Sequence, residues 1–287
     1  MPSLLNKNIT NVINSCSMSA GYNLSKSYYA PMKSKEYYAL ESISPYSQLD
    51  QNRLSEAKQN FQWCFQILQE KVFNSNNIGE MKPYSLLDVG CANGEFLHHY
   101  TNVFLNHDCS KTGIDLTQRF VDVANSLALE NTQFLCADMF DKTLGLEEKY
   151  DIVTCFGTIP VFKDPSTIIE RLFSFAKPGG YVIFDGLINL HNISVNINFC
   201  DYSTAESSGL WRSDFNQHAE VEINNIISKF SDQHEIVRND FMADIPKVED
   251  SPAINVWTFT TSQNKKVVMN GANLILNPSL LFAQKKR

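Results

Sequence analysis

Residues 86–96, with the sequence LLDVGCANGEF, are the segment whose composition and spacing best fit a ligand site. An apolar run ends in a turn of small residues around Gly90 and Gly94, and a helical pattern starts at Glu95. Glycine lets a backbone approach a ligand where a side chain would collide, and the first turn of a helix offers unpaired N–H groups. The segment therefore predicts a strand–turn–helix unit that binds a ligand through its backbone.

Two common nucleotide-binding motifs do not fit this turn. The dinucleotide fingerprint G-x-G-x-x-G would need glycine at the positions held by Ala92 and Glu95. A P-loop is excluded because no Gly-Lys-Ser/Thr sequence follows. An ordinary glycine-containing turn without a ligand is the remaining alternative.

Acidic residues follow two further strand-like runs. Asp115 ends one run just before Leu116, and Asp138 precedes Met139 after another. In an open α/β sheet the carboxyl ends of the strands form the edge where ligands bind, and an acidic group at the Asp115 position can accept both hydroxyl hydrogen bonds of a ribose. Helix capping by Asp115 and turn formation by Asp138 are the structural alternatives.

Hydrophobic periodicity predicts the elements that must position these residues. Asp50 is a candidate cap for the first helix, and Thr117 for a later one. The predicted strands cover 84–89, 112–116, 133–137, 151–156 and 181–184, and the helices between and before them cover 50–72, 95–104, 117–127 and 165–175. Strands that alternate with helices imply a mostly parallel sheet covered on both faces.

The two ends of the chain depart from this alternation. Residues 1–49 show no clean period and are predicted to form a flexible N-terminal lid segment. Residues 50–287 are predicted to form one domain, with an insertion at about 187–215 and extra strands at about 250–272. A helix over 220–230 and strands over 235–242, 255–261 and 280–283 complete the predicted pattern.

Composition limits the classes of function. The chain has 287 residues, of which 43% are hydrophobic and 19% charged, so it can bury a sizeable core. No apolar run reaches the roughly 18 to 20 residues that span a bilayer, and residues 1–20 lack a signal-type segment, so a cytoplasmic protein is expected. A net charge of -7 without a broad basic stripe disfavours nucleic-acid binding.

The seven cysteines form no C-x-x-C pair, so a structural zinc site is not expected. Cys136 and Cys155 lie in apolar strand-like runs and are predicted to be small core residues.

The ordered set of motifs resembles that of the class I S-adenosylmethionine-dependent methyltransferases. Residues 88–96 resemble motif I of that family, of the form D-x-G-C-x-x-G-x-F, and the resemblance covers residues 50–185. It implies a Rossmann-like α/β fold with a seven-stranded, mostly parallel sheet, helices on both faces and a C-terminal β-rich addition. It also implies S-adenosyl-L-methionine as the cofactor and S-adenosyl-L-homocysteine as the product.

The resemblance assigns roles to individual residues. Asp115 would bind the ribose, Asp138 the adenine amine with Met139 beside the ring, and Tyr28 or Tyr29 the methionine carboxylate. Those implied to bind the cofactor are Tyr28, Asp88, Gly90, Cys91, Ala92, Gly94, Asp115, Leu116, Asp138, Met139, Phe156 and Gly157.

A general base is needed only when the methyl acceptor carries a proton that must leave. Asp185 and His191, at and after the fifth strand, are the candidate catalytic residues, and Asp201 and His218 are more remote candidates. His98 and His99 are predicted to lie on the surface. In the family, metal-dependent members carry acidic residues just after the fourth strand; here the first is Asp164, so no metal is predicted.

A looser resemblance concerns the acceptor. Residues 211–216, 256–259 and 270–271 resemble a subgroup of methyltransferases found with bacterial capsule and O-antigen enzymes, which methylate sugar hydroxyls or phosphoramidate-type substituents. This favours methyl transfer to an oxygen of a small sugar or capsule precursor. The chain is expected to act as a monomer or homodimer. Methylation of an amine and a catalytically silent cofactor-binding domain stay open, as does a plain packing role for these aromatic residues.

Overall fold

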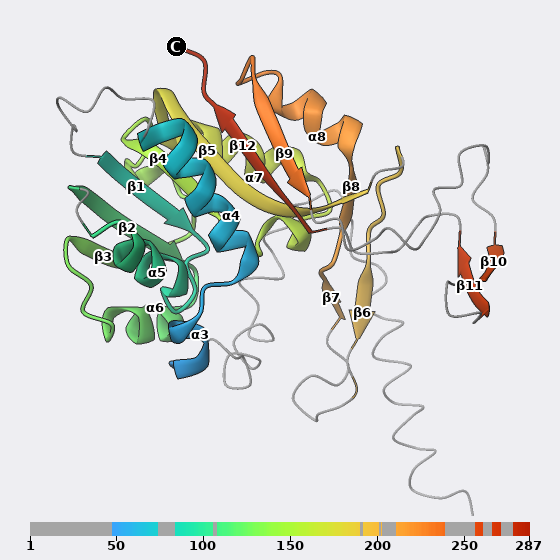
Figure 1. The fold of residues 1–287 in the computed structure, drawn as a ribbon, viewed down its shortest axis with the longest axis horizontal. Coiled ribbons are helices and arrows are strands. Elements are labelled where there is room, and N and C mark those ends of the chain that lie inside the picture. Colours follow the sequence, from blue (N-terminus) through green and yellow to red (C-terminus); the bar gives the residue numbers. More distant parts are fainter. Residues whose placement is uncertain are drawn as a thin grey trace, which may run out of the picture.

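Alternating strands and helices build a mixed α/β fold in the computed structural model of this chain (Figure 1). The structure describes residues 48–73, 84–105, 108–189, 192–200, 202, 211–238, 256–260, 266–270 and 278–287. The predicted N-terminal lid over residues 1–49 therefore lies almost entirely outside the described residues.

Within the described residues, eight strands form the central sheet. They are β1 (Tyr84–Val89), β2 (Cys109–Asp115), β3 (Thr132–Cys136), β4 (Tyr150–Cys155), β5 (Ala176–Asn189), β8 (Gln217–Ala219), β9 (His234–Arg238) and β12 (Pro278–Gln284). The order along the sheet is β3-β2-β1-β4-β5-β12-β9, and β8 pairs with the end of β5. The strands from β3 to β5 are parallel to one another, and β12 runs antiparallel to both β5 and β9. The predicted Rossmann-like sheet is confirmed, and β8 is added to its seven predicted strands.

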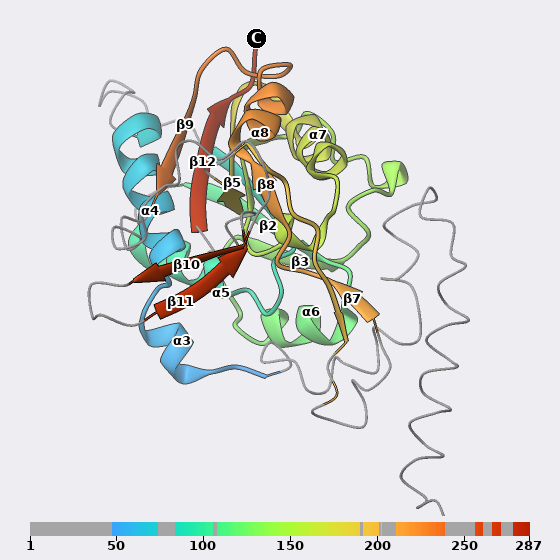
Figure 2. The same cartoon turned by 90° about the vertical axis from the view of Figure 1, so that its right-hand side faces the viewer.

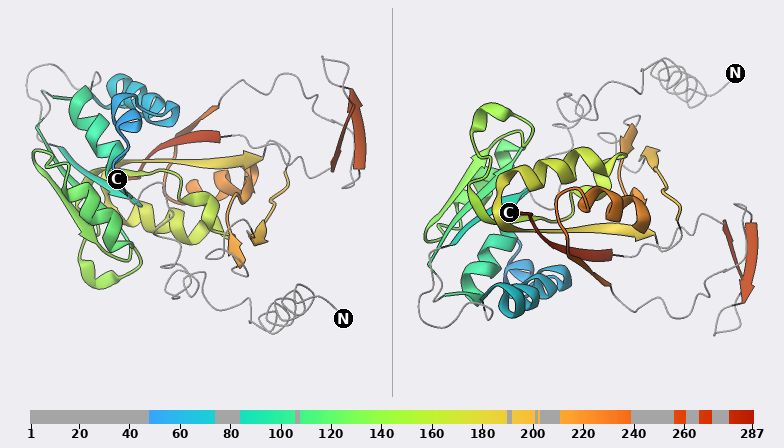
Figure 3. Two further views of the ribbon diagram at one scale, coloured as in Figure 1. Left: turned by 90° about the horizontal axis from the view of Figure 1, so that it is seen from below. Right: turned by 90° about the horizontal axis from the view of Figure 1, so that it is seen from above.

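Helices cover both faces of this sheet (Figures 2 and 3). The helical elements are α3 (Gln51–Ser55), α4 (Gln59–Ile67), the π-helical turn η2 (Leu68–Phe73), α5 (Glu95–Val103), α6 (Gln118–Asn125), η3 (Lys142–Leu144), η4 (Ile159–Val161), α7 (Pro165–Phe175) and α8 (Glu220–Ile227). One apolar core lies between the sheet and α7 and α8, and a second lies between the sheet and α4, α5 and α6.

The predicted helix over residues 50–72 is interrupted. Asp50 caps α3 as predicted, since its carboxylate accepts a hydrogen bond from the Asn52 N–H. Glu56 is extended, and α4 begins only after Lys58. None of the five residues of α3 is buried, so the spacing of apolar residues does not mark where this helix ends.

The C-terminal part contains more strands than predicted. β5 continues to Asn189, beyond the expected end at residue 184, so the insertion begins later than residue 187. Within the insertion, β6 (Asn198–Cys200) pairs with β7 (Trp211–Ser213). A separate pair, β10 (Val256–Thr260) and β11 (Lys266–Asn270), lies within the range of about 250–272 where extra strands were predicted.

Cys155 is fully buried as predicted, whereas the prediction for Cys136 is wrong. Cys136 is exposed because it ends β3, the outermost strand of the sheet, where only Phe134 of the strand is buried. An apolar run does not distinguish a central strand from an edge strand.

Two predictions for polar residues are also wrong. Thr117 precedes α6 but its hydroxyl makes no capping bond and finds no partner among the described residues. His99 is buried, and its Nε2 lies 2.7 Å from the Arg53 carbonyl oxygen because α3 packs over α5. Among the described residues, no helix combines the length and the apolar character needed to cross a membrane.

Candidate functional site

The predicted site residues gather at the carboxyl edge of the sheet. The strand order reverses between the neighbouring strands β1 and β4, and this is where open α/β sheets bind ligands. Asp88 of β1, Asp115 of β2 and Asp185 of β5 lie close enough for the charges of Asp115 and Asp185 to act on Asp88. The structure therefore brings three predicted residues from separate strands to one place.

The turn after β1 is fastened to the end of β2. The backbone N–H groups of Gly90 and Cys91 both donate to the Ile114 carbonyl, at 2.8 and 3.0 Å. The next amide, that of Ala92, donates to Asp115 Oδ2 at 2.9 Å. Gly94 then starts α5 in the left-handed region, with φ of 83° and no side-chain cap. The predicted strand–turn–helix unit is thus present, and its shape depends on β2.

Protein packing, in addition to any ligand, explains the glycines of this turn. Gly90 has φ of 73°, and a Cβ there would lie 2.4 Å from Thr158 Oγ1. A Cβ at Gly94 would lie 2.9 Å from the Phe134 ring. The sequence interpretation gave ligand approach as the reason for both glycines, whereas the structure shows close side chains at both.

Asp115 holds the ends of two elements together. Its Oδ1 accepts from the Thr117 N–H and its Oδ2 from the Ala92 N–H, each at 2.9 Å. Burial raises the pKa of this carboxyl, and the backbone hydrogen bonds oppose that rise. The bond to Thr117 fixes the turn just before α6, whose N-cap residue is Thr117, so Asp115 is not the helix cap. These bonds do not exclude ribose binding, because each carboxylate oxygen can accept a second hydrogen bond.

Asp88 is the most deeply buried carboxyl of the edge, with 2% of its surface exposed. The Thr154 hydroxyl donates to its Oδ1 at 2.8 Å. Burial raises the pKa of Asp88 to about 8; the charges of Asp115 and Asp185 add to the rise, while the Thr154 bond and the Lys58 charge oppose it. An edge with this concentration of carboxyl groups favours a cationic ligand.

The raised pKa of Asp88 predicts a dependence of stability on pH. The folded state keeps a proton that the unfolded state releases, so this group should reduce the free energy of unfolding as pH rises from about 4 towards 8. In thermal denaturation across that range, Asp88→Asn should show a weaker loss of stability than the unsubstituted protein. Asp122→Asn, at an exposed position of α6, is the control. Equal pH slopes for Asp88→Asn and the unsubstituted protein would contradict the assignment.

Asp185 connects the loop after β4 to α4. Its Oδ1 accepts from the Gly157 N–H at 2.6 Å, and its Oδ2 accepts from Asn60 Nδ2 at 2.7 Å. Burial raises the pKa of this carboxyl, and both hydrogen bonds oppose the rise. A carboxyl with a raised pKa at a ligand-binding edge has the properties of a general base.

Of the other catalytic candidates, only His218 lies within the described residues. His191 and Asp201 lie outside the described residues, as does Tyr28 among the cofactor candidates. His218 is wholly buried on β8, with Nδ1 3.9 Å from Glu222 Oε2. Burial lowers the pKa of His218, so the ring is neutral and enclosed.

The residues predicted to contact the adenine, Asp138 and Met139, follow the end of β3. Asp138 Oδ1 accepts from the Phe140 N–H at 2.9 Å, so the turn alternative is present. The Met139 side chain is 9% exposed and packs into the core beneath α7. Leu116 is half-buried, and Cys91 is buried against Gly113. Binding of the adenine by these residues stays a prediction.

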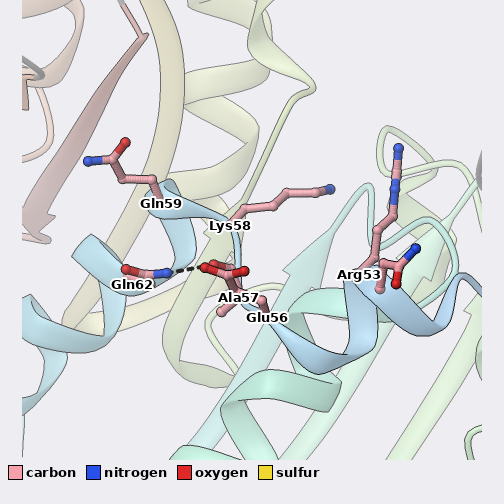
Figure 4. A pocket seen from close by; sticks show the side chains of 7 residues that line it. Arg53, Glu56, Ala57, Lys58, Gln59 and Gln62 are labelled. Atoms are coloured by element: carbon pink, nitrogen blue, oxygen red, sulfur yellow. Dashed lines mark hydrogen bonds between the residues drawn. The ribbon is translucent and has the colours of Figure 1, made fainter. Parts of the chain in front are cut away.

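Two basic residues over the start of α5 were not predicted from the sequence. Glu95, 4% exposed, pairs through Oε2 with Lys58 Nζ at 2.7 Å and through Oε1 with Arg53 Nη1 at 3.3 Å. Both cations line a hollow of about 530 Å³ at the α3–α4 connection (Figure 4). No spacing in the sequence distinguishes these two residues from ordinary surface charges. In the described part of the chain, no group of three or more His, Cys, Asp or Glu side chains is arranged to hold a metal ion.

Comparisons with known proteins agree with this geometry. A family model described as a methyltransferase domain matches residues 80–236. The ubiquinone biosynthesis O-methyltransferase of Leptothrix cholodnii is 30% identical over 109 residues, which cover 37% of this chain and 45% of that protein. The enzyme of the same name from Coxiella burnetii is 28% identical over 125 residues, covering 42% and 48%. The chain thus spans a little under half the length of these curated relatives.

Solved structures share the fold at low identity. The 1,6-didemethyltoxoflavin-N1-methyltransferase of Burkholderia thailandensis, solved with bound 1,6-didemethyltoxoflavin and S-adenosylhomocysteine, matches with a TM-score of 0.50 at 14% identity, covering 90% of this chain and 91% of that one. The CMeT domain of citrinin polyketide synthase matches with a TM-score of 0.51 at 11% identity, covering 79% and 52%. At these identities the likeness shows the fold alone.

Proposed function

Since the chain belongs to the methyltransferase-domain family, we propose that it transfers the methyl group of S-adenosylmethionine to an oxygen atom of a small molecule. The observation that carries the proposal is the convergence of three carboxyl groups on the edge beside the turn at Gly90, those of Asp88, Asp115 and Asp185. The names of the relatives, which are O-methyltransferases, support oxygen as the accepting atom.

The carboxyl edge fits this cofactor in charge and in hydrogen bonding. A sulfonium cation lowers the cost of ionising buried carboxyls such as Asp88, whose pKa is raised to about 8. Asn93 Oδ1 is buried beside the turn and finds no partner among the described residues, so it can accept a hydrogen bond from a ligand. A Cβ at Gly157 would meet no atom within 4 Å, which indicates room at the end of β4.

When bound, S-adenosylmethionine would supply an activated methyl group: a lone pair of the acceptor would bond to the methyl carbon in line with the breaking C–S bond, whose electrons leave with the sulfur of S-adenosylhomocysteine. The residues of the chain have to bind the cofactor and the acceptor, align the two and exclude water. Such positioning can lower the barrier by as much as about 7 to 11 kcal/mol. Asp115 holds the turn and binds the ribose. Asp185 receives the proton that a hydroxyl acceptor loses, and Asn60 and the Gly157 N–H hold its carboxylate in place.

The kind of acceptor can be tested directly. The protein is incubated with methyl-labelled donor and with separate pools of sugars, nucleotide-linked sugars, aromatic alcohols and amines. Label in a hydroxyl-containing pool supports the proposal, and label in the sugar pools would extend it to the capsule precursors that the C-terminal motifs favour. Label in the amine pool alone would contradict oxygen as the accepting atom.

Replacing Asp115 with alanine should weaken binding of S-adenosylhomocysteine by about 1 to 3 kcal/mol, or roughly 5- to 150-fold in Kd, because the ribose hydroxyls lose a charged acceptor. Calorimetry measures this loss, and thermal denaturation shows whether the variant is folded. Asp122→Ala removes an exposed carboxylate from the following helix and should bind normally.

Loss of the bonds to Ala92 and Thr117 could also weaken binding in Asp115→Ala, so a second ligand is needed. An analogue of S-adenosylhomocysteine without ribose hydroxyls should bind the variant and the unsubstituted protein almost equally. An equal loss for both ligands would remove the ribose assignment.

A further inference from the structure

Arg171 of α7 reaches through the core to the loop after β3. Arg171 is 8% exposed, and its Nε donates to the Met139 carbonyl at 2.5 Å. Its Nη2 donates to the Asp141 carbonyl at 3.3 Å. One buried side chain therefore binds the backbone on both sides of Phe140.

Other contacts hold the Nη1 end of this guanidinium. Nη1 donates to Glu147 Oε1 at 2.6 Å and to Ser174 Oγ at 3.2 Å, and the group lies 4.3 Å from the centre of the Phe175 ring. Burying a cation costs free energy unless it is paired and hydrogen-bonded, and an apolar side chain would fill the same space without that cost. The buried arginine therefore makes contacts with the loop backbone that an apolar side chain at this position could not make.

The loop that Arg171 holds is the one that carries Asp138. The Asp138 carboxylate accepts from the Phe140 N–H at 2.9 Å, and the Asp138 carbonyl accepts from the Asp141 N–H at 2.9 Å. At the other end of the loop, the Ala137 N–H donates to the Asp115 carbonyl at 2.8 Å. The turn is thus fixed by β2 on one side and by Arg171 on the other.

We propose that Arg171 is a positioning residue for recognition of the adenine base: it fixes the turn at residues 138–141 so that Asp138 can accept from the exocyclic amine. The inference rests on the proposed function, because it concerns the adenine of S-adenosylmethionine. Arg171 acts through the loop backbone and does not touch the cofactor. A side chain that only stabilised the fold would affect all ligands of the edge alike, whereas this role affects recognition of the amine.

The test compares two ligands that differ at the amine. Calorimetry measures Kd for S-adenosylhomocysteine and for S-inosylhomocysteine, in which an oxo group replaces the amine. We expect Arg171→Met to weaken S-adenosylhomocysteine binding by about tenfold, the equivalent of one hydrogen bond, and to change the Kd of the inosine analogue little. The preference for adenine should fall accordingly. Arg119→Met, at an exposed position of α6, is the matched control and should keep the preference.

Two milder variants keep the test decisive if Arg171→Met does not fold. Arg171→Lys keeps the buried charge but loses the planar fork whose separate nitrogens reach the two carbonyls, so its adenine preference should fall as well. Glu147→Gln removes the charge of one partner of Arg171 and should give a smaller loss of preference.

Equal losses for both ligands, or an unchanged preference in every variant that folds, would overturn the positioning role. If the unsubstituted protein binds neither S-adenosylhomocysteine nor S-adenosylmethionine, the proposed function itself fails and this inference fails with it. Measuring binding by the unsubstituted protein therefore separates a failure of the proposed function from a failure of the positioning role alone.

Discussion

Asp185→Asn is expected to lower the rate of methyl transfer to a hydroxyl acceptor by roughly 10²- to 10⁴-fold, the usual contribution of a general base. The amide cannot receive the proton that the acceptor loses, whereas the carboxylate can. Binding of S-adenosylhomocysteine should change little, because the ribose and adenine contacts are predicted on β2 and β3. Single-turnover rates with labelled donor, together with calorimetry, measure the two quantities separately.

Asp151→Asn provides the matched control for this substitution. Asp151 lies at the opposite end of β4, where its Oδ2 pairs with Lys177 Nζ at 2.8 Å and accepts from Ser85. Its loss should reduce stability without reducing the transfer rate. Equal rates for Asp185→Asn and the unsubstituted protein would show that the acceptor, such as a carboxylate, has no proton to lose, and would remove Asp185 as the base.

Asn60 gives this prediction a second readout. Its donation to Asp185 Oδ2 opposes the rise of the Asp185 pKa. Asn60→Ala should therefore raise that pKa further and move the acidic limb of the rate profile to higher pH. A profile that drops in height but does not move along the pH axis would indicate that Asn60 acts only through packing.

The parts of the fold that the sequence predicted well are those whose signals are local. β1 spans Tyr84–Val89 as predicted, because a short apolar run between a loop and a glycine turn allows few other structures. The helix after Gly94 begins at Glu95, where the pattern placed it. Asp115 ends β2, as the sequence predicted.

The parts that were missed depend on contacts between distant segments. Arg53 and Lys58 become part of the site only because α3 and α4 pack over the start of α5 and meet Glu95. Arg171 is separated from Met139 by 32 positions, and nothing in a helical pattern marks one arginine as buried. The exposure of Cys136 follows from the place of β3 in the strand order, which a single run of residues does not encode.

The requirement for glycine at position 90 has both a local cause and a distant cause. The sequence indicates a tight turn, which explains the positive φ of 73°. Only the structure shows that Thr158, from the loop after β4, occupies the space that a Cβ would need. These two causes are separable, because one belongs to the backbone and the other to a neighbouring side chain.

Gly90→Ala is expected to reduce the free energy of unfolding by about 2 to 5 kcal/mol. About 1 to 2 kcal/mol comes from placing a residue with a Cβ in the left-handed region, and about 1 to 3 kcal/mol comes from the contact with Thr158 Oγ1. The substitution should also displace the turn and weaken binding of S-adenosylhomocysteine. Denaturant unfolding and calorimetry measure the two effects.

A second substitution isolates the contact with Thr158. In the Gly90→Ala, Thr158→Ala double variant the hydroxyl is absent, so stability should recover by about 1 to 3 kcal/mol relative to Gly90→Ala alone. Gly157→Ala is the matched control for the backbone cost, since Gly157 has φ of 68° and open space around its Cβ position. It should lose only about 1 to 2 kcal/mol. If Gly90→Ala is no more destabilising than Gly157→Ala, the close approach of Thr158 does not explain the glycine, and the turn is specified by its backbone conformation alone.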